Sequence, residues 1–200
     1  MGWSARLCGG ALAVVVAATP VWAADTVQAQ IDAARAAYQK NDLPRTAQAL
    51  EAAMAEVLDR LGKALAETMP PATGGWQAEA PEIQGLGQVG GGVAVTRAYG
   101  KGESSLNVSL FLDSSAVADA ASQLANSDAA GGASNTRRVK VGNEDAVLRF
   151  DAANASGEVT MVLGTRVLLS VEGDNIASGD ILVEAAKGWN LARIRQIVGP

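Results

Sequence analysis

The 200-residue sequence predicts an α+β fold, in which an antiparallel helical hairpin precedes a mainly antiparallel sheet of about six strands packed by two helices. Apolar residues recur at helical spacing up to about residue 65, and they alternate with polar residues from about residue 93 onward. The alternating segments follow one another through short turns, which favours antiparallel pairing because parallel strands need longer crossover connections. Helices and strands are therefore segregated along the chain, as in α+β proteins.

Residues 1–23 have the pattern of a secretory signal peptide. Arg6 precedes a short apolar run, and Val21 and Ala23 occupy the −3 and −1 positions of a cleavage site. The apolar run is too short to span a bilayer comfortably, so we expect no stable membrane anchor. Cleavage after Ala23 would also remove Cys8, the single cysteine of the chain. The Ala- and Gly-rich composition is typical of bacterial proteins, and we expect a periplasmic or secreted protein.

Residues 24–69 predict the helical hairpin. Asp25 and Gln28 resemble a capping box at the start of the first helix, and Pro44 suits the first turn of the second. The second helix carries a narrow apolar seam with steps of three and four residues: Ala47, Leu50, Met54, Val57, Leu61 and Leu65. This seam must be buried, and two partners remain open: the sheet domain of the same chain or another copy of the hairpin.

Residues 70–82 form a Pro/Gly-rich linker, and residues 83–200 form the sheet domain. The predicted strands cover residues 93–99, 106–112, 136–141, 146–151, 158–163 and 166–172. Asp113-Ser114-Ser115 caps a short helix with Val117, Ala121 and Leu124 facing inward. A final helix spans about residues 180–197, and Gly188 is the point where it would bend or split, because glycine weakens helices. The helices are expected to cover the apolar face of the sheet.

One local pattern resembles a known family. Met69-Pro70-Pro71 and Gly75-Trp76, followed by two groups of β-hairpins, an intervening helix and a C-terminal helix, resemble the Mog1/PsbP-type α+β domain of exported bacterial proteins. The resemblance covers residues 70 to 200 and leaves the hairpin outside. Members of this class are mostly accessory or binding proteins, so the resemblance implies a binding role; it assigns no binding residues.

The composition excludes several kinds of chemistry. The chain has no histidine, and this removes imidazole bases and histidine metal sites. Gly85-Leu86-Gly87-Gln88-Val89-Gly90 matches a dinucleotide-binding fingerprint, but a strand rather than a helix follows it. Serine nucleophile motifs are lacking. We therefore expect no enzyme activity, catalytic residue, cofactor or metal. The 4% aromatic content and the net charge of −5 also make nucleic acid an unsuitable partner.

Acidic residues in the second half could instead supply oxygen ligands to calcium or a carboxylate pair for an envelope hydrolase, two less favoured hypotheses. The candidates are Asp113, Asp119, Glu144, Asp145, Glu172, Asp174 and Asp180. The favoured interpretation is that they are solvated turn and surface residues.

Basic residues offer the main candidate site. Arg138, Lys140, Arg149 and Arg166, together with Arg137, would form a cationic strip if neighbouring strands aligned them, and this strip would receive an anionic ligand or an acidic partner surface. The alternative, which we favour, is cross-strand pairing with the nearby carboxylates Glu144, Asp151, Glu158 and Glu172. Trp76 and Trp189 are either core anchors, the favoured interpretation, or walls of a site.

The sequence therefore predicts a non-enzymatic accessory protein of the cell envelope, whose sheet domain binds a protein partner or a small ligand. The alternative is an assembly factor that forms a homo-oligomer through the helical hairpin.

Overall fold

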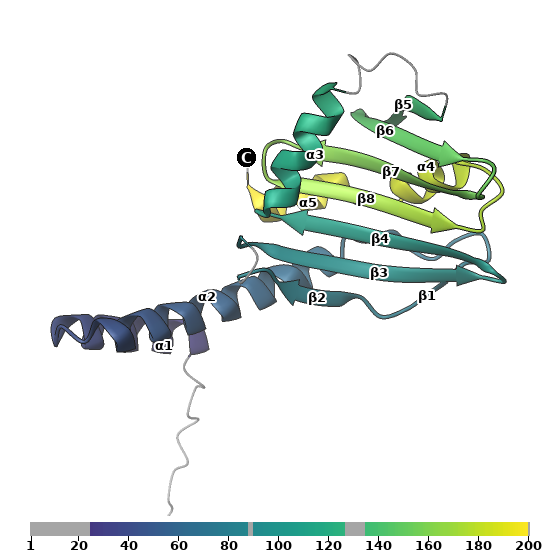
Figure 1. Cartoon of the computed structure of the whole chain (residues 1–200). Helices are drawn as coiled ribbons and strands as arrows, with labels where there is room; N and C mark the ends of the chain where they lie inside the picture. Colours follow the sequence, from purple (N-terminus) through teal and green to yellow (C-terminus); the bar gives the residue numbers. More distant parts are fainter. Residues whose placement is uncertain (1–24, 88–89, 127–134, 200) are drawn as a thin grey trace, which may run out of the picture.

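The computed structural model describes residues 25–87, 90–126 and 135–199. The predicted signal peptide lies outside the described residues. The fold is α+β, as predicted: two N-terminal helices precede an antiparallel sheet with helices packed on it (Figure 1). The helices are α1 (Thr26–Gln39), α2 (Leu43–Ala66), α3 (Ser115–Asn126), α4 (Asp180–Lys187) and α5 (Leu191–Val198). The strands are β1 (Gln77–Ala78), β2 (Glu82–Gly85), β3 (Val93–Lys101), β4 (Ser104–Leu112), β5 (Thr136–Val141), β6 (Glu144–Asp151), β7 (Ser156–Leu163) and β8 (Val167–Asp174).

The sheet of the described residues has eight strands rather than about six. Its order is β1-β3-β4-β8-β7-β6-β5, with β2 also paired to β3, and every pair is antiparallel. The two additional strands lie at the edge beside β3, and β1 falls inside the predicted linker. Neither shows the alternation that marks a strand, because β1 has only two residues and Ile83 is the single large apolar residue of β2.

The two faces of the sheet are covered by different helices. On one face, Val95, Leu110 and Leu169 belong to a large core that also includes residues of α2, α4 and α5. On the other face, α3 packs Val117 and Ala120 against Leu168. Figure 1 shows α3 in front of the sheet and α4 and α5 behind it. The expectation that every helix covers one apolar face is therefore wrong for α3, because Phe111, Val162 and Leu168 form a small apolar patch on the opposite face of the sheet.

Local signals explain where the helices begin and end. Asp25 caps α1 by accepting a hydrogen bond from the Val27 amide at 3.1 Å, without the predicted capping box. The predicted final helix is split at Gly188, which ends α4, and Asn190 then caps α5 by accepting from the Arg193 amide. In α3, Ala121 is exposed and Ala120 takes the predicted inward position.

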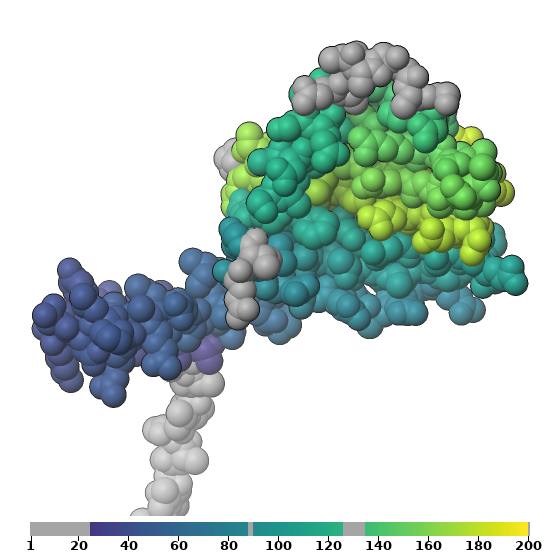
Figure 2. All heavy atoms as spheres, viewed as in Figure 1, coloured from purple at the N-terminus to yellow at the C-terminus, as the bar shows by residue number. Residues whose placement is uncertain are grey.

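The hairpin of α1 and α2 projects from one corner of the sheet domain (Figures 1 and 2). Its helices meet through four buried alanines, Ala34, Ala37, Ala49 and Ala53. Only the last part of the predicted seam is covered: Leu65 is buried and Leu61 packs on the core, whereas Leu50, Met54 and Val57 are exposed. No described helix is both long and apolar enough to cross a membrane.

Candidate binding pocket

A pocket of about 460 Å³ lies on the core side of the sheet, between the segment that follows α2, strands β3 and β4, and helix α4. Its apolar lining includes Pro70, Trp76, Leu106, Val108 and Ile181. This volume falls within the range of about 300–1,000 Å³ that is usual for small-molecule sites. The pocket exists because the chain turns away from α2 at two prolines, which cannot continue the helix, and then crosses the end of α4.

Two hydrogen bonds fix the wall formed by the segment after α2. The hydroxyl of Tyr99, on β3, donates to the Pro70 carbonyl oxygen at 2.5 Å. Tyr99 is only 4% exposed, and burial raises the pKa of its hydroxyl, so the group stays protonated and able to donate. Nearer the mouth, Lys101 Nζ donates to the Gly74 carbonyl oxygen at 2.7 Å. The wall is therefore attached to β3 at two points.

Gly188 allows the same wall to approach α4 closely. A Cβ at this position would lie 2.9 Å from the Cβ of Pro70 and 3.1 Å from the Ala185 carbonyl oxygen. These distances are shorter than ordinary van der Waals contacts. A side chain at residue 188 would therefore push Pro70 and the pocket wall away from α4.

Three charged side chains line the pocket: Asp180 and Glu184 are in ion pairs, and Lys101 is hydrogen-bonded to the Gly74 carbonyl oxygen. Asp180 pairs with Arg137 at 2.5 Å, and Glu184 pairs with Lys187 at 2.6 Å. Both carboxylates of the lining are in ion pairs, and the Lys101 ammonium lies near the mouth, so the apolar interior offers no buried counter-charge to an ionised ligand. Burying an unpaired charge there would be costly. Its chemistry suits a neutral, largely apolar molecule.

The two tryptophans of the described residues have different roles. Trp76 is half-buried: it packs against the edge of the core, as favoured from the sequence, and it also forms a wall of the pocket. Trp189 is 5% exposed and belongs to the core. The pocket itself was not predicted from the sequence. The only local signal was the Pro70-Pro71 and Gly75-Trp76 segment, which predicted a linker rather than a wall.

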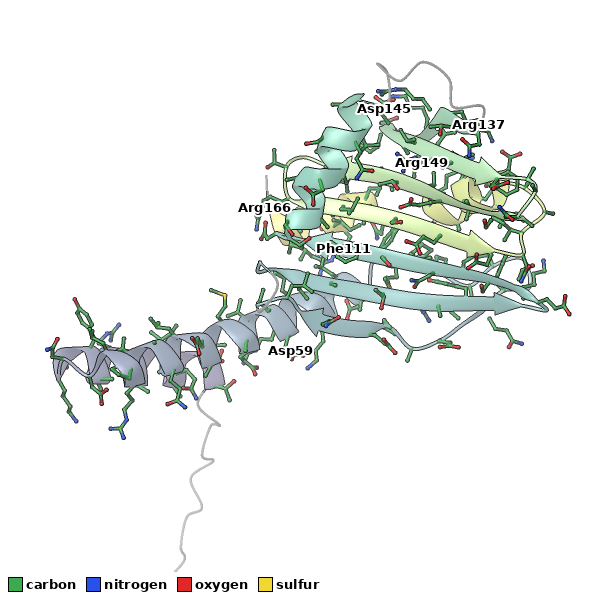
Figure 3. The ribbon with its side chains drawn as sticks, viewed as in Figure 1. Asp59, Phe111, Arg137, Asp145, Arg149 and Arg166 are labelled. Carbon is green, nitrogen blue, oxygen red and sulfur yellow. The ribbon has the colours of Figure 1, made fainter. Side chains whose placement is uncertain are left out.

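The structure divides the predicted cationic strip. Arg138, Lys140 and Arg149 share the polar face of β5 and β6. Arg137 faces the other side and pairs with Asp180. Arg166 lies apart in the turn between β7 and β8 (Figure 3).

The partners of these residues explain the division. Arg166 donates to both carboxylate oxygens of Asp113, at 2.7 Å each, and to the Val198 carbonyl oxygen at 2.6 Å. This bidentate pair lowers the pKa of Asp113. Lys140 pairs across the strands with Asp145 at 2.8 Å. Arg149 lines a smaller hollow of about 250 Å³ beneath α3, together with Glu158.

The candidate carboxylates are similarly dispersed. Asp113, Asp145 and Asp180 are in the ion pairs described above, and Glu144 pairs with Arg195 at 2.6 Å. Asp119 lies on α3, and it lines the smaller hollow. In the described part of the chain, no three acidic or cysteine side chains are grouped to hold a metal ion.

Glu172 on β8 lies directly opposite Glu158 on β7. Burial and the nearby carboxylates Glu158 and Asp174 raise the pKa of Glu172. Glu158 accepts hydrogen bonds from the hydroxyls of Thr160 and Ser170, at 2.8 and 3.0 Å. This pair was not recognised from the sequence, because residues 14 positions apart become neighbours only through the strand register.

Fold and pocket together define an α+β domain with a preformed apolar cavity and a projecting helical hairpin. Comparisons with protein-family models, with curated proteins and with solved structures found no match.

Proposed function

We propose that the protein is an exported, non-enzymatic accessory protein that binds a small, neutral and largely apolar molecule in the pocket between Trp76 and α4. The observation that carries the proposal is the apolar cavity of about 460 Å³ whose two rim carboxylates, Asp180 and Glu184, are already in ion pairs. Export is inferred from the signal-peptide pattern of residues 1–23. We further infer a Mog1/PsbP-type domain, supported by the segment from Met69 to Trp76.

Binding without catalysis is supported by the groups that line the pocket. The Tyr99 hydroxyl is used to hold Pro70, and the acidic residues at the rim are in ion pairs. The carboxylate pair Glu158 and Glu172 belongs to the polar face of the sheet, away from the apolar cavity. A carboxylate-based hydrolase has less support, because only Glu158 of this pair lines the smaller hollow beneath α3, and its carboxylate already accepts hydrogen bonds from Thr160 and Ser170.

The proposal is tested with N-phenyl-1-naphthylamine, a neutral apolar fluorophore, titrated into the chain from Ala24 onward. We expect saturable binding of one probe per chain, with energy transfer from Trp76. Ala185→Phe places a ring in the pocket and should weaken binding at least tenfold. The matched control, Ala192→Phe, adds the same ring at an exposed position of α5 and should leave the affinity unchanged.

Two results would contradict the proposal: fluorescence that rises without saturation, or an affinity that Ala185→Phe leaves unchanged. Because the hairpin also exposes apolar side chains, the titration is repeated with Leu50→Glu/Met54→Glu. Pocket binding should survive this double substitution.

A further inference from the structure

The hairpin exposes the large apolar side chains that would ordinarily form a core. The large hydrophobic residues that are exposed in the described part of the chain all belong to it: Ile31 (38%), Tyr38 (67%), Leu43 (57%), Leu50 (52%), Met54 (59%) and Val57 (42%). These six residues are called the hairpin face below. Scattered exposed hydrophobic residues are normal, but a concentration on one element indicates an interaction surface.

The contact between α1 and α2 shows the opposite composition. The residues buried where the helices meet are Ala34 and Ala37 on α1 and Ala49 and Ala53 on α2. Alanine buries little apolar area, so this contact contributes little stability by itself. The hairpin is held near its base by Arg60, which donates to Asp25 at 2.8 Å and to Glu56 at 2.8 Å. The two helices therefore pack closely through alanines, and their larger apolar side chains remain exposed on the surface of the hairpin.

Helix geometry puts the six side chains on one side of the hairpin. At about 100° per residue, the line through Leu50, Met54 and Val57 is rotated by roughly 100° from the line of alanines that faces α1. On α1, Ile31 and Tyr38 are rotated by roughly 70° in the same sense from its own alanines. Because the two helices run antiparallel, these rotations carry both sets toward the same side. The hairpin face is therefore continuous across α1 and α2.

We propose that the hairpin face binds a second copy of this chain, forming an antiparallel four-helix bundle between two molecules. Six side chains of this size and exposure present roughly 600 Å² per copy. Pairing two such faces would bury roughly 1,200 Å², which reaches the range of specific protein interfaces. This proposal is independent of the ligand pocket.

Charge and shape both suit a copy of the same hairpin. Residues 25–66 contain six acidic and five basic side chains, so most of the negative charge of the protein lies elsewhere and two hairpins meet with little repulsion. The seam has the three- and four-residue spacing of packed helix pairs. An antiparallel register centred at residue 52 places Leu50 against Met54 of the other copy, and the small Ala47 against Val57.

The projection of the hairpin makes this arrangement accessible. Figure 2 shows that the hairpin extends away from the sheet domain. In an antiparallel pair related by a two-fold axis, the two sheet domains lie at opposite ends of the bundle. The same face then serves both molecules, as a closed two-fold dimer requires.

Sedimentation equilibrium of the chain from Ala24 onward, between 1 and about 500 µM, tests the proposal, since weak specific interfaces fall in this range of dissociation constants. We expect a reversible monomer–dimer equilibrium. Leu50→Glu/Met54→Glu should raise the dissociation constant at least 100-fold. Gln48→Glu/Ala52→Glu adds the same charge on the exposed side away from the hairpin face, and it should leave the constant within about threefold.

Cysteine cross-linking gives a second test that does not depend on a disruptive substitution, because the chain after Ala23 has no cysteine. An oxidised mixture of Leu50→Cys and Met54→Cys proteins should form a covalent dimer, and Ala52→Cys should not. A monomer at every concentration would overturn the proposal. So would a dimer that Leu50→Glu/Met54→Glu leaves intact, or a monomer that binds only a protein of different sequence on this face.

Discussion

Gly62 is the point where the hairpin meets the sheet, and Gly62→Ala tests that contact. A Cβ at this position would lie 2.3 Å from Ile83 Cγ2 and 3.2 Å from Val93 Cγ2. Both neighbours are β-branched and therefore stiff at χ1, and Val93 is fully buried. The helix must move outward, or Ile83 must leave its rotamer.

Two opposing effects determine how much Gly62→Ala changes the free energy of unfolding. Alanine in place of glycine favours a helix by about 1 kcal/mol. Overpacking of a close contact costs about 1–3 kcal/mol. We therefore expect Gly62→Ala to lower the free energy of unfolding by about 1 kcal/mol. In an Ile83→Ala background the obstructing methyl is absent, so the same substitution should stabilise the protein by up to about 1 kcal/mol, giving a coupling free energy of about 2 kcal/mol.

Urea unfolding followed by the fluorescence of Trp76 and Trp189 measures these quantities. Gly85→Ala is the matched control, because a Cβ there has no neighbour within 4 Å, although it lies on the same strand as Ile83. We expect this control to stay within about 0.5 kcal/mol of wild type. If Gly62→Ala stabilises the wild-type protein as much as the Ile83→Ala protein, the proposed close contact is refuted.

Three further predictions concern single side chains. Tyr99→Phe should lower the free energy of unfolding by about 1 kcal/mol, because the Pro70 carbonyl loses its hydrogen-bond donor. The same substitution should weaken binding of the naphthylamine probe. An unchanged affinity would show that this hydrogen bond does not hold the pocket wall in place. Asp113→Asn should destabilise the protein at pH 7 by less than about 1 kcal/mol, since the pair with Arg166 is exposed. The folded-state pKa of Asp113 is lowered, so this stabilisation is present above the unfolded pKa and is lost as the pH falls through the folded value. Urea unfolding at pH 7 and pH 2.5 checks this, and an equal difference at both pH values would contradict it. Glu172→Gln should raise the melting temperature at pH 7 but not at pH 3. The folded-state pKa of Glu172 is raised, so its ionisation costs stability as the pH rises. If scanning calorimetry shows no gain in melting temperature at pH 7, carboxylate repulsion does not destabilise the protein at this position.

A strand was predictable where its own sequence alternates between apolar and polar residues. The alternation of Leu106, Val108, Leu110 and Leu112 is local, and the structure buries all four side chains. The split at Gly188 was also predictable, because it depends on the backbone propensity of one residue. By contrast, β1 and β2 depend on pairing with β3, and two to four residues contain too little pattern to reveal it.

Other features depend on contacts that the sequence order does not contain. The seam of α2 indicated an interface, but its spacing could not show that alanines face α1 while Leu50 and Met54 remain exposed. The sequence could not show that Arg166 pairs with Asp113, which is 53 residues earlier in the chain, and lies apart from the other basic residues. The pocket combines Pro70, Leu106 and Ile181, which only the folded chain brings together.

The most direct test of the proposed function is to map the binding of N-phenyl-1-naphthylamine by two-dimensional amide NMR of the chain from Ala24 onward. We predict saturable shifts for amides around the pocket, at Thr73, Lys101, Ser178 and Ala185, while the amides of Leu50 and Met54 on the hairpin keep their positions. Shifts confined to the hairpin, or spread evenly over the protein without saturation, would contradict it.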